Sequence, residues 1–363
     1  MNNTTDKLSY THVNLTRWVS STITPIILLG CAIGNIVSFF VLLRPRLRKE
    51  TTSIYLAVLC VAEMGTCYTG LLRQFLIDAF SLDIRSINGF SCRIHIYLTY
   101  VFLRLAPLIL ALVTLQRYLF VGQLALCSLK QTIIQLCSCT LFVLIAEFHL
   151  FIYYDFTHSD TRPRNQSPLE CTVDTLRHGK YYAFRSKIYP KLSLVLYTII
   201  PLAIIIIGNA LLIRKVREAS RRSNSKTNKK RSITRMLYAV SILYTVLTSP
   251  AAIFLALAPA SYQLTPRFRL EWTLLRLLFY LCHSVNFLLF CASGSTFRQE
   301  LVVFLKAISC CCQLNCTDRK VKHNDVKLNN RVRFIPDDTK RNYAEQNQKL
   351  NPSKLADNSH DLL

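Results

Sequence analysis

The sequence predicts an all-α integral membrane protein, a seven-transmembrane helix bundle with a short amphipathic eighth helix. Three observations support this fold class. Of the 363 residues, 51% are hydrophobic, and the mean hydropathy is +0.28. Charged residues, 18% of the chain, gather between long apolar stretches, in a block pattern typical of membrane proteins. Lipid offers the backbone no hydrogen bonds, so the stretches that cross it must be helical.

Seven apolar stretches are long enough to span a hydrocarbon core about 30 Å thick, which takes about 20 helical residues. They are Val19–Leu43, Ser53–Phe80, Cys92–Val121, Gln131–Tyr153, Lys191–Ile213, Ile233–Leu257 and Trp272–Ala292. The chain therefore divides into an N-terminal segment (1–18), the helix bundle (19–292), an amphipathic helix (293–309) and a polar tail (310–363) that we expect to be disordered.

Lysines and arginines in the connecting segments predict which side of the membrane each segment faces. They gather after the first and fifth stretches, as Arg44, Arg46, Arg48, Lys49, Arg221, Arg222, Lys226, Lys229, Lys230 and Arg231. Because cytoplasmic loops carry an excess of Lys and Arg, we expect the N-terminus outside the cell and the C-terminus in the cytoplasm. The net charge of +24 then favours contact with an anionic lipid surface, at the plasma membrane, rather than with nucleic acid.

Sequons for N-glycosylation agree with this orientation. They begin at Asn2, Asn3 and Asn14 before the first stretch, and at Asn165 after the fourth. A further sequon at Asn315 falls on the cytoplasmic side, so we expect it to stay unmodified.

The segment after the seventh stretch carries the signals of a membrane-surface helix. Phe297, Leu301 and Phe304 recur at helical spacing, beside Arg298 and Lys306. This pattern predicts an amphipathic helix that lies in the interface. Adjacent cysteines next to a membrane surface are typical palmitoylation sites, and we expect the modification at Cys310, Cys311 and Cys312.

The third stretch connects the two sides of the membrane. Cys92 opens it on the outside, and Cys171 lies in the long external segment Asp155–Ile188, so the oxidising compartment favours a disulfide over two free thiols. Arg117 follows Cys92 by 117 − 92 = 25 residues, or about 37 Å of helix. An arginine there can simply set the orientation, but the spacing and the following Tyr118 favour a functional role.

Short motifs follow one another in order along these stretches. They are Gly34–Asn35, Ser53–Glu63, Cys92, Gln116–Arg117–Tyr118, Pro201, Pro250 and the run HSVNFLLFCASGSTFRQEL from His283. With these motifs at these spacings, residues 19–309 resemble the rhodopsin-like (class A) G-protein-coupled receptors. The run from His283 looks most like that of invertebrate neuropeptide receptors of the FMRFamide and myosuppressin kind.

The resemblance implies a mechanism and two partners. An external ligand favours a state in which the sixth helix swings outward at its inner end. A heterotrimeric G protein then docks in the cleft against Gln116, Arg117 and Tyr118. Pro201 and Pro250 give bends at which this swing can hinge, although membrane helices also tolerate prolines that have no such role. The long external segment favours a peptide ligand.

Several positions depart from the pattern of that family. Gln116 replaces the acid before the third-helix arginine, and Lys230 lies where some members carry an acid. We therefore expect raised basal signalling. Thr248 replaces a tryptophan and Asn209 a tyrosine, and the proline and tyrosine that usually follow Asn286 are missing. These changes bear on switching more than on the fold.

Ionisable residues inside a membrane are costly and therefore mark candidate sites. Glu63 replaces the aspartate that lines a sodium pocket in the family. We expect Glu63 to hydrogen-bond His283, with Asn35 and Asn286 completing a polar network, and we do not expect sodium to bind. Alternatively, Glu63 is protonated and merely tolerated.

Arginines set the expectations for the ligand side. Arg104 is expected to pair with Glu147 on the neighbouring fourth helix rather than to contact a ligand. The resemblance places five residues around the ligand cavity: Arg73, Thr99, Tyr100, Arg276 and Tyr280. The two outer arginines favour an anionic or carbonyl-rich ligand group, unless both extend to the membrane interface. Amine receptors have an aspartate at the position of Thr99 and opsins a lysine at that of Tyr280, so neither ligand is expected.

Two other classes of function fit the sequence less well. A small transporter or channel would explain the intramembrane charges, but the chain shows no internal repeat and no pair of broken helices. A membrane enzyme needs a catalytic motif, and no HExxH, paired carboxylates or nucleophile–base motif occurs. The 14 cysteines lack metal-ligand spacing, so we expect no metal and no cofactor.

Overall fold

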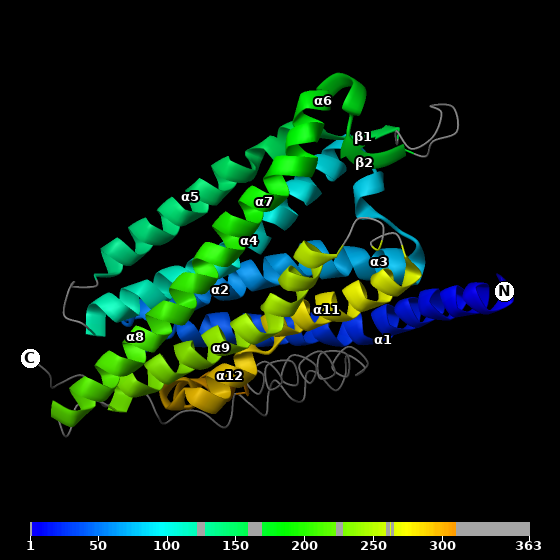
Figure 1. Cartoon of the computed structure of the whole chain (residues 1–363). Helices are drawn as coiled ribbons and strands as arrows, with labels where there is room; N and C mark the ends of the chain where they lie inside the picture. Colours follow the sequence, from blue (N-terminus) through cyan, green and yellow to red (C-terminus); the bar gives the residue numbers. More distant parts are fainter. Residues whose placement is uncertain are drawn as a thin grey trace, which may run out of the picture. The chain divides into compact units, whose positions relative to one another are not determined.

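The computed structural model describes residues 2–121, 128–158, 169–222, 228–258, 262 and 265–309. The chain divides into two units, Met1–Leu301 and Val302–Leu363. In the second unit, residues 302–309 are helical. The first unit is a bundle of long helices with a β-hairpin at one end (Figure 1).

Two of the first four membrane helices have a clear cap at one end. The four are α1 (Asn2–Leu42), a second helix made of α2 (Thr51–Thr66), the π-helical turn η1 (Cys67–Leu71) and α3 (Leu72–Phe80), then α4 (Gly89–Val121) and α5 (Leu129–Tyr153). Ser81 ends α3 with a left-handed φ of 55°, as helix C-caps often do. Ser128 and Gln131 start α5 with a reciprocal capping box.

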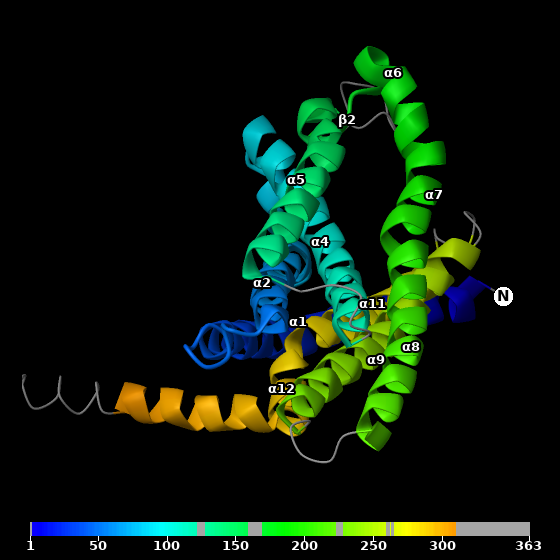
Figure 2. The same ribbon diagram turned by 90° about the vertical axis from the view of Figure 1, so that its left-hand side faces the viewer.

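The fifth membrane helix is one long helical run with two π-helical turns (Figure 2). It consists of α6 (Thr175–Ala183), η3 (Phe184–Ile188), α7 (Tyr189–Leu194), η4 (Val195–Ile199) and α8 (Ile200–Arg222). Turn η4 ends just before Pro201, which has no N–H to continue the regular hydrogen-bond ladder.

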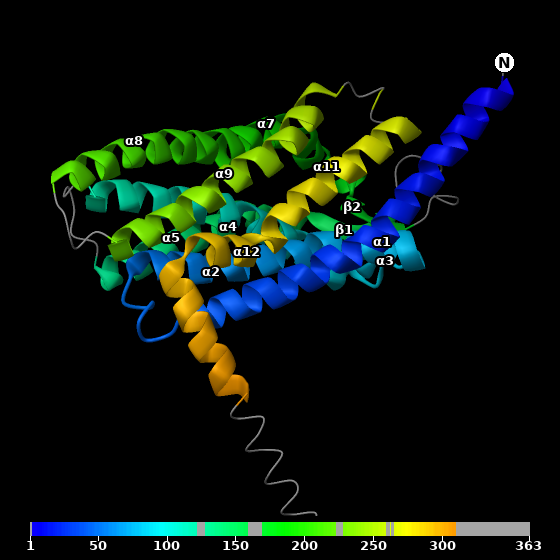
Figure 3. The same ribbon diagram turned by 90° about the horizontal axis from the view of Figure 1, so that it is seen from below.

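The last two membrane helices differ in continuity. The sixth, α9 (Asn228–Leu257), contains Pro250. The seventh is broken at Val285 into α11 (Pro266–Ser284) and α12 (Asn286–Ser293), which are bent by 46° relative to each other (Figure 3). Residues 295–309 are helical, and the interfacial position of this segment stays a prediction.

The hairpin consists of β1 (Tyr154–His158) and β2 (Leu169–Val173). The strands are antiparallel, and Phe156 lies opposite Cys171. A second short element, the 3-10 turn η2 (Ile84–Ser86), connects α3 to α4.

Packing inside the bundle and exposure outside it both fit a lipid solvent. The helix α4 contacts α2, α5 and α8, while α1 contacts α2 and α11. Cys31 and Leu71 belong to a buried cluster between these helices. On the outside, Ile26, Ile145 and Leu288 are 71%, 68% and 62% exposed. Lipid tails solvate such aliphatic surface, whereas water does not.

Each predicted stretch coincides with a helix, and the predicted seven-helix fold is confirmed in the family comparison below. By length and apolarity, five described helices can cross a membrane and the α11–α12 pair adds a sixth, while α9 contributes the shorter apolar segment Tyr238–Phe254. Several helices start before their predicted apolar stretches, most clearly the first, which begins at Asn2, and the fifth, which begins at Thr175. Hydropathy detects only the apolar part of a helix, and both helices continue as polar turns beyond it.

Candidate functional site

The outer end of the bundle, which we define as the end of α4 that carries Cys92, is tied to the β-hairpin. A disulfide joins Cys92 to Cys171 of β2. Cys92 is buried in a small cluster that includes Leu150. Arg93 Nη2 also donates to Asp155 Oδ2 of β1 at 2.5 Å. A disulfide, this ion pair and a hydrogen bond from Arg93 Nε to the Tyr154 carbonyl oxygen hold the hairpin to α4.

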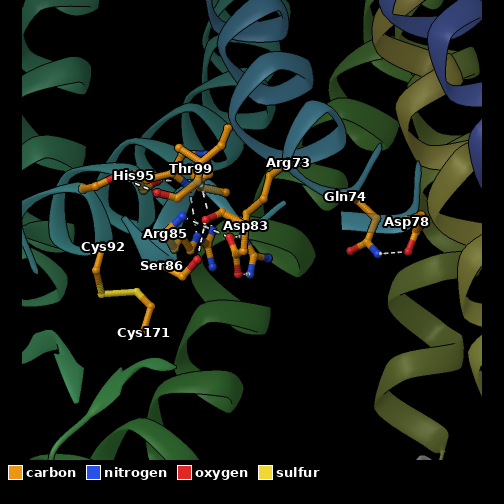
Figure 4. Close-up of polar contacts among 12 residues, drawn as sticks. Arg73, Gln74, Asp78, Asp83, Arg85, Ser86, Cys92, His95, Thr99 and Cys171 are labelled. Carbon is orange, nitrogen blue, oxygen red and sulfur yellow. Dashed lines mark hydrogen bonds and ion pairs between the residues drawn. A yellow bond between two sulfur atoms is a disulfide. The ribbon is translucent and has the colours of Figure 1, made fainter. Parts of the chain in front are cut away.

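Five polar residues form what we call the outer arginine cluster: Arg73, Asp83, Arg85, His95 and Thr99 (Figure 4). Arg73 donates to Asp83 Oδ1 at 2.8 Å and to Oδ2 at 2.5 Å. Arg85 donates to His95 Nδ1 at 3.0 Å and to Thr99 Oγ1 at 3.3 Å. One aspartate thus faces two arginines, so the cluster carries an excess positive charge.

Burial and charge change the ionisation of the loop residues in this cluster. Burial raises the pKa of Asp83, but the hydrogen bonds from Arg73 and the Arg85 amide outweigh it, so the pKa lies below its usual range. Burial, followed by the nearby charge of Arg73, lowers the pKa of Arg85 to about 10. Both groups therefore stay charged at neutral pH.

A cavity of about 250 Å³ lies between α4, the fifth helix, α9 and α11. Of the described residues that line it, Arg104 and Arg276 carry charge. Arg276 Nη2 donates to Thr273 at 3.5 Å, and Nε has no hydrogen-bond partner. Within the described part of the chain, no carboxylate forms an ion pair with Arg276. Most other polar lining groups are aromatic or small: Tyr197, Tyr244, Thr248, Ser249, Trp272 and Tyr280.

Arg104 has a different environment from Arg276. Its Nε lies 3.7 Å from Glu147 Oε1, and the Tyr189 hydroxyl donates to Glu147 Oε2 at 2.5 Å. The Arg104 guanidinium also stacks over the rings of Tyr100 and Tyr197, at 5.4 and 4.9 Å from their centres. Arg104 therefore lies beside the predicted counter-charge and lines the cavity as well.

The four residues of the predicted polar network lie together. Asn286 Nδ2 donates to Glu63 Oε1, and Asn35 Nδ2 donates to the His283 carbonyl oxygen at 2.9 Å. His283 Nδ1 is 3.8 Å from Glu63 Oε1. The His283 ring therefore lies close to Glu63 at ion-pair distance, and a hydrogen bond between the two stays a prediction. Asn286 is the first residue of α12 after the break at Val285, which the sequence pattern did not predict.

The inner end of the bundle, which carries Arg117, joins α4 to its neighbours. Gln116 Nε2 donates to Thr132 Oγ1 of α5 at 3.0 Å. Arg117 is only 4% exposed. Lys215 Nζ of α8 lies 4.3 Å from the centre of the Tyr118 ring. The three residues predicted to contact a G protein thus lie where α4 meets α5 and α8.

A family model described as "7 transmembrane receptor (rhodopsin family)" matches residues 34–290. The match covers more than half of the chain, including α4 with Cys92 and Arg117 and all the residues that line the cavity. The chain belongs to the rhodopsin family of seven-transmembrane receptors. The receptor is therefore a multi-pass protein of the plasma membrane, and it is not an enzyme. As a member of this family it binds a ligand and signals through heterotrimeric G proteins. No individual curated protein matches it.

The residues predicted to bind the receptor's ligand fall into two groups. Arg276 and Tyr280 line the cavity, whereas Arg73, Thr99 and Tyr100 do not. Arg73 is neutralised by Asp83, a contact that the sequence did not suggest because it depends on how the link between α3 and α4 folds back.

Two arginines were missed by sequence analysis. Arg85 lies in the link between α3 and α4, and Arg185 lies in η3, just before the predicted fifth stretch. The Arg185 guanidinium stacks over Tyr100 and Tyr189, and its Nη2 donates to the Tyr100 hydroxyl. In the sequence, both arginines are recognisable only as positive charges next to an apolar stretch. Such charges more often lie at the membrane interface than in a binding site.

The predicted modification sites are only partly within the described residues. Asn14 is exposed on α1, and Asn2 and Asn3 begin the same helix. Asn165, Cys310, Cys311 and Cys312 lie outside the described residues. Glycosylation and palmitoylation of the receptor stay predictions.

Proposed function

We propose that the receptor is activated by an extracellular peptide, and that this peptide places an acidic group in the cavity beside Arg276. One observation carries the proposal. Arg276 is half-buried and lines the cavity, its buried Nε has no hydrogen-bond partner, and no described carboxylate pairs with it. A cation inside a membrane protein without a counter-ion is costly, and its usual justification is a bound partner. A carboxylate or sulfate on the ligand supplies the missing charge.

A peptide fits the surroundings better than a small metabolite. The cavity, at about 250 Å³, has room for one or two side chains but not for a whole peptide. The rest of the ligand would lie against the outer arginine cluster and the hairpin held by Cys92 and Cys171. The excess positive charge of that cluster favours an acidic peptide and speeds its approach.

The same cavity offers a route from ligand to G protein. Thr248 and Ser249, directly before Pro250 on α9, line it together with Arg276 on α11. A ligand that binds more tightly when α9 has moved shifts the receptor toward that state. Arg117 and its neighbours then form the predicted contact with the G protein.

The test compares peptides in matched pairs on cells that express the receptor. Neuropeptides are screened as free acids and as amides, and G-protein activation is measured. With any active acid peptide, Arg276→Gln is expected to raise the half-maximal concentration about 10- to 100-fold. Arg269→Gln on the exposed face of the same helix serves as the control.

Two outcomes separate the parts of this proposal. If amides activate as well as acids and Arg276→Gln has no effect, the acidic group is wrong while the peptide ligand stands. If no peptide activates at normal surface expression, the peptide ligand itself is wrong.

A further inference from the structure

Arg185 is a second cation at the outer end of the bundle that lacks a carboxylate partner among the described residues. It lies in η3 and is half-buried. Its Nη2 donates to the Tyr100 hydroxyl, while its buried Nε has no hydrogen-bond partner. Within the part of the chain that the structure describes, no carboxylate forms an ion pair with Arg185. A phenol offsets only part of a guanidinium charge, and oxyanions are the stronger partners.

The Tyr100 ring is shared by two arginines that differ in their counter-charge. The Arg104 guanidinium lies 5.4 Å from the centre of this ring and the Arg185 guanidinium 5.1 Å. Glu147 lies 3.7 Å from Arg104 and also accepts a hydrogen bond from Tyr189. Arg185 has only the Tyr189 ring at the corresponding place, 4.5 Å from its guanidinium. The one carboxylate therefore serves Arg104, and the charge of Arg185 stays uncompensated.

Arg85 adds a further positive charge close to the same rings. The charges of Arg85 and Arg185 both act on Tyr100 and on Tyr154 of the hairpin. Asp83 lies beside Arg85 (Figure 4), but it accepts both of its side-chain hydrogen bonds from a different arginine. The two positive charges repel each other, and an oxyanion close to both removes this repulsion.

The position of Arg185 differs from that of a cation that simply extends to the membrane interface. Arg177 and Lys187, on the same helical run, are exposed as such cations usually are. Arg185 instead stacks over two rings. Neither Arg185 nor Arg85 lines the ligand cavity, so an anion bound here is separate from one bound at Arg276.

We propose that Arg185, together with Arg85, binds a second acidic group of the ligand, an oxyanion that is either a side-chain carboxylate or a sulfate ester. The inference rests on the proposed peptide ligand and makes that ligand diacidic, with one acidic group at Arg276 and the other at Arg185. The planar guanidinium is held by two ring stacks. It therefore loses little conformational freedom when an oxyanion binds.

The experiment measures how anions protect individual arginines of the purified full-length receptor. Phenylglyoxal modifies accessible guanidinium groups, and mass spectrometry of the digested receptor gives the modification rate at each arginine. The probes are inorganic sulfate, methyl sulfate and acetate, each compared with chloride at equal ionic strength. Exposed Arg177 is the matched control, and Arg276 reports on the ligand cavity in the same sample.

The expected result is a modification rate at Arg185 that falls about tenfold in about 100 mM sulfate, as for a Kd of about 10 mM, with no change at Arg177. Arg85→Gln is expected to weaken this protection about three- to tenfold, because one of the two charges is lost. Stronger protection by methyl sulfate than by acetate assigns the site to a sulfate ester, and the reverse order assigns it to a carboxylate.

Three results overturn the proposal. One is equal protection of Arg185 and Arg177, which is what screening by salt alone produces. Another is an Arg185 that phenylglyoxal does not modify even in chloride, because the site is then closed to small solutes. The third is protection of Arg276 without Arg185, which leaves the acidic group proposed for the ligand cavity intact. Protection of Arg185 without Arg276 instead supports the second site and counts against an acid in the cavity.

Discussion

Arg104 and Glu147 lie inside the helix bundle, where a buried charge is stable only beside its partner. Their side chains are 12% and 1% exposed, and Tyr189 donates to the same carboxylate. Removing one member of a buried pair leaves a charge without compensation, whereas replacing both by apolar residues is often neutral. The two members are therefore expected to depend on each other.

This dependence gives a double-mutant prediction. Glu147→Gln is expected to lower the free energy of unfolding by about 3–5 kcal/mol, because Arg104 stays buried and charged. The double variant Arg104→Met/Glu147→Leu is expected to recover most of this loss. Thermal inactivation in detergent and the amount of receptor at the cell surface measure both effects. A Glu147→Gln variant as stable as the natural receptor would show that the pair contributes little.

Gly70 lies in the π-helical turn η1, against the side chain of Tyr280 from α11. A Cβ at this position would overlap the Tyr280 hydroxyl and lie 3.0 Å from Tyr280 Cζ. A larger residue therefore fits here only if the Tyr280 side chain from α11 moves away. At Gly179 in α6, by contrast, a Cβ meets nothing within 4 Å.

Gly70→Ala is accordingly expected to destabilise the receptor by about 1–3 kcal/mol through overpacking. Adding Tyr280→Phe removes the overlapping oxygen, so the double variant should lose less than the sum of the two single changes. Gly179→Ala serves as the control and is expected to be neutral or slightly stabilising. Melting temperatures of the purified variants decide the matter, and equal values for Gly70→Ala and Gly179→Ala would rule out the overlap.

At the scale of elements, Asp83 holds the link between α3 and α4 in place. It accepts two hydrogen bonds from Arg73 of α3 and one from the Arg85 amide. The folded pKa of Asp83 is below its usual value. Its stabilising contribution is therefore present above the unfolded pKa of about 3.9, and it is lost as the pH falls through the lower folded pKa.

The link is thus expected to stay protected between about pH 5 and pH 8 and to loosen only in stronger acid. Asp83→Asn removes the charge at every pH and is expected to expose the link at neutral pH as well. Hydrogen exchange of residues 81–88 measures this exposure. Equal exchange in Asp83→Asn and the natural receptor at pH 7 would mean that other contacts hold the link.

At the scale of the whole molecule, the membrane explains what the sequence could predict of the fold. Lipid demands about 20 apolar helical residues per crossing, so α5 was predicted as Gln131–Tyr153 and found as Leu129–Tyr153. Outside the lipid this constraint is absent. The polar helix α6 starts after Asp174, whose carboxylate accepts from the amides of Leu176 and Arg177, and no hydropathy pattern shows this cap.

The site was less predictable, because its chemistry depends on contacts between distant segments. Arg73 and Arg276 looked equivalent in the sequence, but Arg73 is neutralised by Asp83 and Arg276 is not paired with any described carboxylate. Similarly, Glu63 accepts a hydrogen bond from Asn286, the first residue of α12 after the break at Val285, while the His283 ring lies 3.8 Å away. Residue types alone do not distinguish these arrangements.

Signalling without ligand depends on the fraction of receptor molecules that are in the active rather than the resting state. Gln116 precedes Arg117 at the inner end of α4, where its amide donates to Thr132 of α5. An amide carries no charge, so it attracts the neighbouring guanidinium less than a carboxylate does. Replacing Gln116 by an acid therefore adds an attraction that is strongest while Arg117 stays buried.

We accordingly expect basal G-protein activation above that of mock-transfected cells. Gln116→Glu is expected to lower this activation about tenfold. An added attraction to Arg117 of about 1.4 kcal/mol shifts the equilibrium between the two states by that factor. Gln131→Glu is the matched control, because it adds the same charge to an exposed position at the start of α5. Basal activation per receptor at the surface is measured without ligand. If the natural receptor signals no more than mock-transfected cells, or if both variants lower signalling equally, the amide at position 116 does not set the resting balance.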